Sequence, residues 1–238
     1  MKFKRLVSTG CGYMQGYAHG QGHVDLAQQL GIAYAHSLSM SDSSNARIFR
    51  TVHADSLQNK ETTLYVIGLT FLGRWDMLLN QNPVQQEGRW TSFQNQQSIK
   101  DITSTVLTSE EFSILLDIKI KTEEFSIPDR IWDLSLTLRA LIDSLKQRSH
   151  GCVIFNTAED LILPWLDNAE IKSLLEVPEI VKGLKWLSVP YQFDHGVAPS
   201  RFDHANGLPA HHKHTNPGEH DVLNAFLVDY INTIYDTN

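Results

Sequence analysis

Three segments of the chain carry the pattern of β-strands. They lie at Phe3–Ser8, Thr63–Leu69 and Cys152–Phe155. The second is a continuous apolar run, which is typical of strands that are buried on both faces of a parallel sheet. Strands of this kind occur where helices cover both sides of the sheet, so the pattern already favours an α/β protein.

Apolar residues at helical spacing predict four helices between and after these strands. The first two helices both lie between the first two strands, and the third leads directly into the last strand. The fourth has clear start signals, since Asn216 can cap it, Pro217 suits the first helical position and Glu219 lies three residues after the cap. The predicted helices are His23–Leu30, Ser43–Leu57, Pro128–Leu145 and Pro217–Ile234. Their alternation with the strands predicts βαβ units.

The length of 238 residues suits one domain with one sizeable core, spanning 1–238. The stretch Asn80–Thr108 is rich in Gln, Asn and Ser and has little periodicity. We interpret the region around 80–127 as a long surface excursion of this domain and not as a linker.

Composition and charge restrict the function. The formal net charge is −7, which disfavours nonspecific binding to nucleic acid or to an anionic membrane. A membrane-spanning helix needs about 18 consecutive apolar residues, and no apolar run in the chain is that long. The apolar stretch near the N-terminus is too short for a signal peptide. The two cysteines are too few for a disulfide scaffold, so a reducing, cytoplasmic location is predicted.

The turn Ser8–Gly16 follows the first strand directly. In open α/β sheets ligands bind beyond the carboxyl ends of the strands, so we expect a site at this turn. Its glycines do not form a dinucleotide fingerprint, because Gln15 stands where a third glycine is needed. No cofactor is therefore predicted.

Several segments, in order and at matching spacing, resemble the SGNH (GDSL-type) hydrolases, most closely the SGNH-like proteins common in viral and phage genomes. They are Leu6–Tyr13, Asp25–Gly31, Ser43–Ile48, Val66–Thr70 with the following Arg74, Gly88–Trp90 and His214–His220. The resemblance extends over nearly the whole chain, and only the middle, about 91–129, matches loosely.

The resemblance implies a flavodoxin-like, three-layer α/β/α fold with a central parallel sheet. Members of the family are esterases, lipases or carbohydrate deacetylases, so the implied ligand is a small ester or an acetylated carbohydrate. In the family a serine after the first strand attacks the ester, and a histidine before the last helix acts as base, with an aspartate three residues before it. By position His214 corresponds to the base, and its loop is expected beside the turn Gly10–Gly16.

Several family positions carry other residues in this chain. Gly12 stands at the position of the nucleophilic serine and has no side chain. Asp42 aligns with the oxyanion glycine, and its charge would oppose an oxyanion. The segment Gly68–Phe71 lacks the usual Asn and Asp, and His211 replaces the aspartate that orients the base.

Other residues are candidates for the site. Cys11 is either a thiol nucleophile beside the family position or a small buried residue. The candidates for substrate binding are Gly12, Tyr13, Asp42, Asn45, Thr70 and Arg74. For Asn45 a polar network at a helix start is the alternative, and for Arg74 a solvated helix face.

Five histidines lie in the segment His204–His220. The composition fits a metal site in which His211 and His214 converge, and it equally fits a surface loop, since no cysteine or regular spacing accompanies it. We assign no metal. If the imidazoles converge, the protein should be sensitive to mild acid.

Two hypotheses therefore stay open. The chain is either a divergent SGNH esterase or deacetylase, or a catalytically silent SGNH-like protein that binds a ligand or serves as a virion component. For a viral protein the location would be the host cytoplasm or the virion. The sequence leaves the oligomeric state undetermined.

Overall fold

The structure is a computed structural model. It describes residues 3–40, 43–70, 75–79, 89–93, 127–157, 167–181 and 217–235. Asp42, Arg74, His211 and His214 lie outside the described residues, as does most of the predicted excursion.

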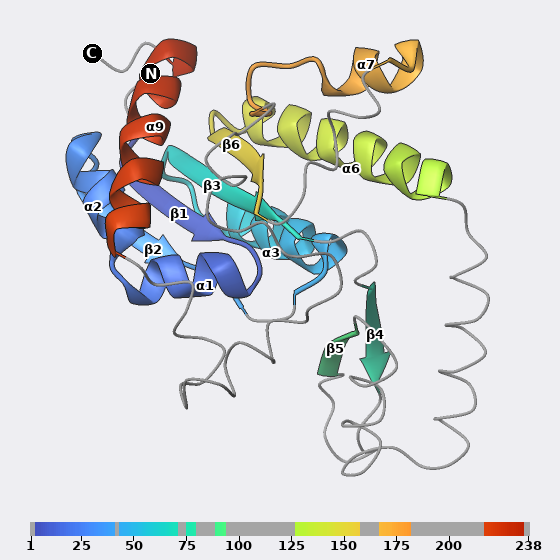
Figure 1. Ribbon diagram of the computed structural model, residues 1–238, viewed down its shortest axis with the longest axis horizontal. Coiled ribbons are helices and arrows are strands. Elements are labelled where there is room, and N and C mark those ends of the chain that lie inside the picture. Colours follow the sequence, from blue (N-terminus) through green and yellow to red (C-terminus); the bar gives the residue numbers. More distant parts are fainter. Residues whose placement is uncertain are drawn as a thin grey trace.

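Within the described residues a sheet of four parallel strands forms the centre of the molecule (Figure 1). The strands are β1 (Arg5–Thr9), β2 (Tyr34–Ser37), β3 (Thr63–Leu69) and β6 (Gly151–Asn156), in the order β2-β1-β3-β6. All residues of β1, β3 and β6 are buried, as the predicted strands require. The sequence pattern missed β2, a four-residue strand whose residues are exposed or half-buried.

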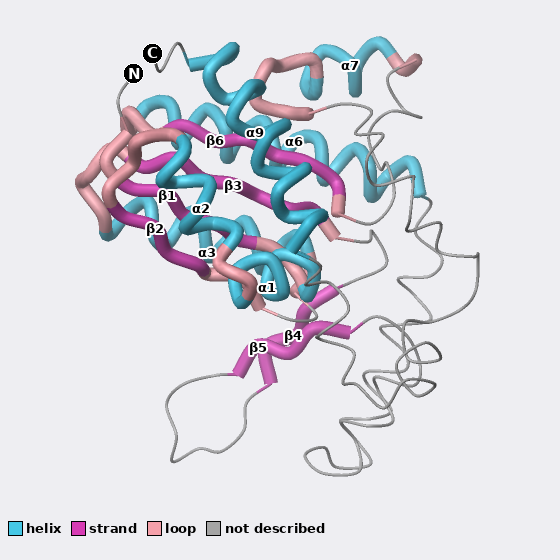
Figure 2. The backbone as a smooth tube through the Cα atoms, turned by 60° about the vertical axis from the view of Figure 1, so that its left-hand side comes forward, coloured by secondary structure: helices cyan, strands magenta, loops and turns pink. Residues whose placement is uncertain are grey.

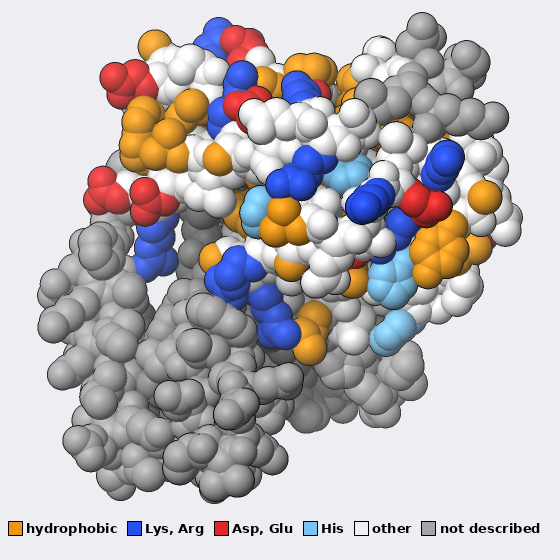
Figure 3. All heavy atoms as spheres, turned by 180° about the vertical axis from the view of Figure 1, so that it is seen from behind, with side chains coloured by type: hydrophobic (Ala, Val, Ile, Leu, Met, Phe, Trp, Pro, Cys, Tyr) orange, Lys and Arg blue, Asp and Glu red, His pale blue; other side chains and the backbone are white. Residues whose placement is uncertain are grey.

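Helices cover both faces of this sheet (Figure 2). One face carries α1 (Gly12–His19), α2 (Gly22–Gln29) and α9 (Pro217–Tyr235). The other carries α3 (Asn45–Gln58) and α6 (Ile127–Gln147), with α7 (Ala169–Leu175) packed on α6. The fold is therefore the predicted three-layer α/β/α arrangement. Figure 3 shows the face with α3 and α6 from outside, where charged, histidine and apolar side chains are interspersed.

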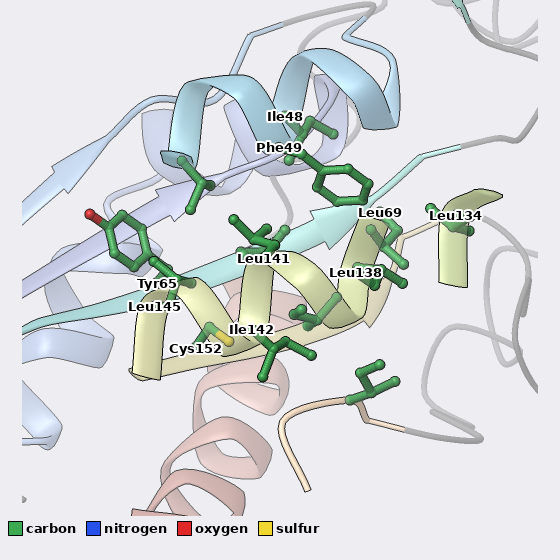
Figure 4. Packing of buried hydrophobic residues seen from close by; sticks show 14 of the residues in the cluster. Ile48, Phe49, Tyr65, Leu69, Leu134, Leu138, Leu141, Ile142, Leu145 and Cys152 are labelled. Carbon is green, nitrogen blue, oxygen red and sulfur yellow. The ribbon is translucent and has the colours of Figure 1, made fainter. Parts of the chain in front are cut away.

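Alternate residues of each strand supply the two sides of the described core. On β3, Tyr65, Ile67 and Leu69 pack against α3 and α6, whereas Leu64 and Val66 pack against the helices of the opposite face. In Figure 4 the apolar side chains of α3 and α6 meet those of β3. The α6 residues Leu138, Leu141, Ile142 and Leu145, at helical spacing in the sequence, are all buried there.

Two sets of hydrogen bonds cover the outer edge of β6. Residues 179–181 run alongside β6 and form a parallel bridge between Ile180 and Ile154. Nearer the start of the strand, the Tyr235 hydroxyl accepts a hydrogen bond from the N–H of Cys152 and donates one to its carbonyl oxygen, both at 2.8 Å. With this bridge the strand order is that of the flavodoxin-like folds.

An antiparallel pair of strands, β4 (Trp75–Leu79) and β5 (Arg89–Phe93), forms a separate small sheet (Figure 1). Strand β5 falls inside the predicted excursion, where the sequence shows little periodicity. Among the described helices, none is both long and apolar enough to cross a membrane.

Candidate functional site

The candidate site lies at the carboxyl edge of the sheet, where β1 and β3 end. Strand β1 lies between β2 and β3 in the sheet. The connection from β1 to β2 therefore crosses one face of the sheet, and the connection from β2 to β3 crosses the other. The point where the strand order reverses is where open α/β sheets bind ligands. Four described segments reach it: the turn from β1 into α1, the start of α3, and the residues that follow β3 and β6.

Two glycines allow α1 to pack closely on the strand ends. A Cβ atom at Gly10 would lie 2.4 Å from Cγ of Met14 and 2.8 Å from the carbonyl oxygen of Gly68. A Cβ atom at Gly68 would lie 2.5 Å from the same Cγ atom and 2.5 Å from Cγ2 of Thr157. The fully buried Met14 side chain therefore occupies the space above both glycines.

Gly12 is the first residue of α1, at the position where the family resemblance expects a nucleophilic serine. The chain presents only backbone there. The side chain of the preceding residue, Cys11, does not cap the helix. The first N–H groups of α1 consequently lie at the carboxyl edge of the sheet, where the positive end of the helix dipole favours an oxygen-rich or negatively charged group.

The Cys11 thiol is buried and takes part in a short hydrogen-bond chain. Its Sγ atom lies 3.4 Å from Oγ1 of Thr157. The Thr157 hydroxyl lies 2.7 Å from the carbonyl oxygen of Leu69 and must donate to it, because a carbonyl only accepts. A hydroxyl has one proton, so the thiol is the donor in the first bond. In this arrangement Cys11 is a neutral thiol directed across the end of β3 toward β6.

The second cysteine, Cys152, lies away from the candidate site. It belongs to β6 and its side chain is buried against α6. Burial raises the pKa of the Cys152 thiol, so it is protonated at neutral pH.

Asn45 holds the end of β3 against the start of α3. Its Nδ2 donates to the carbonyl oxygen of Thr70 at 3.0 Å, and its Oδ1 accepts from the N–H of Thr70 at 2.8 Å. Both ends of the amide are thus bonded to backbone, which is the polar-network alternative. The Thr70 hydroxyl is buried and has no hydrogen-bond partner in the described part of the chain, so it remains a candidate for ligand binding.

Tyr13 lies in the first turn of α1, and its ring belongs to the buried cluster on the face of α1, α2 and α9. The structure thus brings Cys11, Gly12, Asn45 and Thr70 to one edge and buries the Tyr13 ring in the core. Thr157 was not among the residues predicted from the sequence. The available signal was its position, since a polar residue directly after a buried strand lies at the carboxyl edge.

One histidine of the His204–His220 segment falls within the described residues. His220 is buried near the start of α9, where its ring packs edge-on against Tyr17 with 5.2 Å between the ring centroids. Its environment is that of a core residue. Among the described residues no group of three or more histidine, cysteine or acidic side chains is placed to hold a metal ion.

No protein-family model matches the sequence, and no curated protein matches it at a significant level. The fold and the geometry together define a class, a three-layer α/β/α protein with a parallel sheet and a candidate site at its carboxyl edge.

Proposed function

We propose that this chain is an SGNH hydrolase-like protein whose carboxyl-edge site binds a small ester or an acetylated carbohydrate without hydrolysing it. The strand order and the position of the candidate site support the relationship to this fold family. The observation that carries the proposal is the absence of a side chain at Gly12, the first residue of α1.

The neighbouring thiol does not replace the missing hydroxyl in this geometry. To attack an ester, Cys11 would have to lose its proton and its hydrogen bond to Thr157. The parts that suit binding are present, since the edge offers the first N–H groups of α1 and the buried hydroxyl of Thr70. A carbonyl oxygen of an ester or acetyl group is an acceptor for such donors.

One observation favours a second candidate, a thiol-dependent hydrolase. Cys11 is the residue directly before α1, and a helix N-terminus favours a negatively charged group such as a thiolate. In this alternative, ligand binding displaces the thiol from Thr157.

The test combines turnover and binding. The native protein, Cys11→Ala and the matched control Cys152→Ala are assayed against aryl acetates and acetylated sugars, and ligand binding is measured by calorimetry and NMR. We expect binding without turnover in all three proteins. Turnover that is lost in Cys11→Ala and retained in Cys152→Ala would establish the thiol hydrolase. Neither binding nor turnover with the whole panel would contradict both candidates.

A further inference from the structure

Three polar side chains form a hydrogen-bonded cluster at the opposite, amino edge of the sheet. Arg5, the first residue of β1, donates two hydrogen bonds to the carboxylate of Asp55 on α3, at 2.6 and 2.9 Å. The Tyr65 hydroxyl on β3 donates to the same carboxylate at 2.7 Å. These contacts connect α3 to the amino-terminal parts of β1 and β3, away from the candidate site.

His150 lies beside this group, in the turn between α6 and β6. Its side chain is buried, and its Nδ1 accepts a hydrogen bond from the N–H of Thr63 at 3.2 Å. Nδ1 therefore carries no proton, and the proton of the neutral ring is on Nε2. The imidazole also lies near the backbone of Ser56, close to the end of α3. The ring also packs edge-on against Tyr65, with 5.8 Å between centroids. One neutral imidazole thus joins the start of β3, the end of α3 and the α6–β6 turn.

The turn that presents His150 adopts a conformation that its sequence does not favour. Ser149 has a φ of 61°, in the left-handed region, which is unfavourable for a residue with a side chain. The N–H of His150 bonds to the carbonyl oxygen of Leu145 at 2.9 Å. This bond and the one from the N–H of Ser149 to the carbonyl oxygen of Lys146, at 3.0 Å, close the end of α6. The turn so formed places the imidazole of His150 beside the start of β3.

We propose that His150 is an acid-sensitive latch, which holds the α6–β6 turn to β3 and α3 as the neutral imidazole and releases it on protonation. A proton on Nδ1 would face the N–H of Thr63, so two donors would meet where one bond existed. The amino edge of the sheet then opens at the junction of β3 and β6.

The surrounding charges decide the direction of the effect. Burial lowers the pKa of His150, and the cations Arg148 in the same turn and Arg5 on β1 lower it further. The hydrogen bond with Ser56 and the charge of Asp55 on α3 act the other way and are outweighed. The stabilisation that neutral His150 contributes is therefore complete above the ordinary histidine pKa of 6.5. It decreases as the pH falls below that value.

The test follows the imidazole and the Thr63 amide directly by NMR. We expect His150 in the native protein to be protonated on Nε2 alone at pH 7.5 and to titrate below pH 6.5. We also expect the hydrogen-exchange protection of Thr63, corrected for the intrinsic rate, to fall by up to about tenfold for each pH unit below 6.5 until His150 has titrated. His150→Asn supplies an acceptor oxygen near Nδ1 that does not titrate, and it should remove this pH dependence.

The control is His53→Asn, since His53 is an exposed residue of α3. This variant should behave as the native protein does. A His150 that titrates at or above pH 6.5, or equal pH dependence of Thr63 protection in native and His150→Asn proteins, would overturn the proposal. The titration is measured on the native chain, so it decides the question even if the variant does not fold.

Discussion

Gly68→Ala adds one methyl group directly beneath the candidate site. The new carbon would lie 2.5 Å from Cγ of Met14 and 2.5 Å from Cγ2 of Thr157, about 1 Å inside the favourable carbon–carbon distance. Neither neighbour can yield freely, because Met14 is fully buried and the Thr157 hydroxyl is bonded to a strand carbonyl. We expect a loss of about 1–3 kcal/mol in the free energy of unfolding, as for overpacked cores in general.

A second substitution tests whether the collision with Met14 is the cause. Met14→Ala alone should cost about 2–5 kcal/mol, because it removes a buried side chain and leaves a cavity. In the double variant the methyl group at position 68 occupies part of that cavity. The combined loss should therefore be smaller than the sum of the two single losses, by about 1 kcal/mol or more.

The assay is urea unfolding of the native protein, Gly68→Ala, Met14→Ala and the double variant. In the same four proteins, mass spectrometry measures the rate at which a thiol reagent modifies Cys11. Displacement of Thr157 should expose Cys11 and speed its modification, whereas Cys152 should be unaffected. Gly31→Ala is the control, since its Cβ atom would meet no neighbour within 4 Å and its cost comes from a φ of 66°. Its effect should add to that of Met14→Ala. Additive losses for Gly68→Ala and Met14→Ala would refute the reasoning.

Three further predictions concern contacts that hold the layers together. Tyr235→Phe leaves two backbone groups of β6 without their partner and should cost about 1–3 kcal/mol in urea unfolding. Tyr230→Phe is the control and should cost about 0.5–1 kcal/mol, because its hydroxyl donates a short bond to the carbonyl oxygen of Pro178 and only a long one, at 3.4 Å, to that of Ile180. Burial raises the pKa of Asp55, but the hydrogen bonds from Arg5 and Tyr65 outweigh it and lower the pKa. The resulting stabilisation is complete above about pH 4 and is lost as the pH falls through the folded pKa, so Asp55→Asn should flatten that part of a melting profile. Asn45→Ala leaves the buried N–H and the carbonyl oxygen of Thr70 without their side-chain partner and should cost about 2–4 kcal/mol in urea unfolding.

Local sequence patterns were sufficient for much of the fold. Strand β3 was predictable because a strand covered on both faces needs apolar side chains at every position. Helix α9 was predictable from its start signals and its apolar face, and α6 from the spacing of its leucines. The resemblance to SGNH hydrolases implied the same three-layer arrangement, while the hydrolase activity that it implies stays a prediction.

Other features were not predictable from local patterns. Strand β2 is short and lies at the edge of the sheet, where partly exposed residues leave no clear periodicity. The hydrogen bond between Cys11 and Thr157 joins residues 146 positions apart, and that between Thr63 and His150 joins residues 87 positions apart. Nothing near either residue in the sequence indicates its partner. The predicted acid sensitivity was assigned to the His204–His220 segment, whereas the described histidines with lowered pKa values are His23 and His150.

The sequence by itself determined which segments are buried, where most helices begin and end, and that Gly12 supplies no nucleophile, because these properties depend on the residues and their spacing. Only the tertiary structure decided that the Cys11 thiol is a hydrogen-bond donor, that Asn45 is committed to the end of β3, and that His150 is a neutral acceptor. Each of these depends on the register of parallel strands, which brings distant segments to the same edge of the sheet. The chemical state of a side chain follows from the atoms around it, and those atoms come from other parts of the chain.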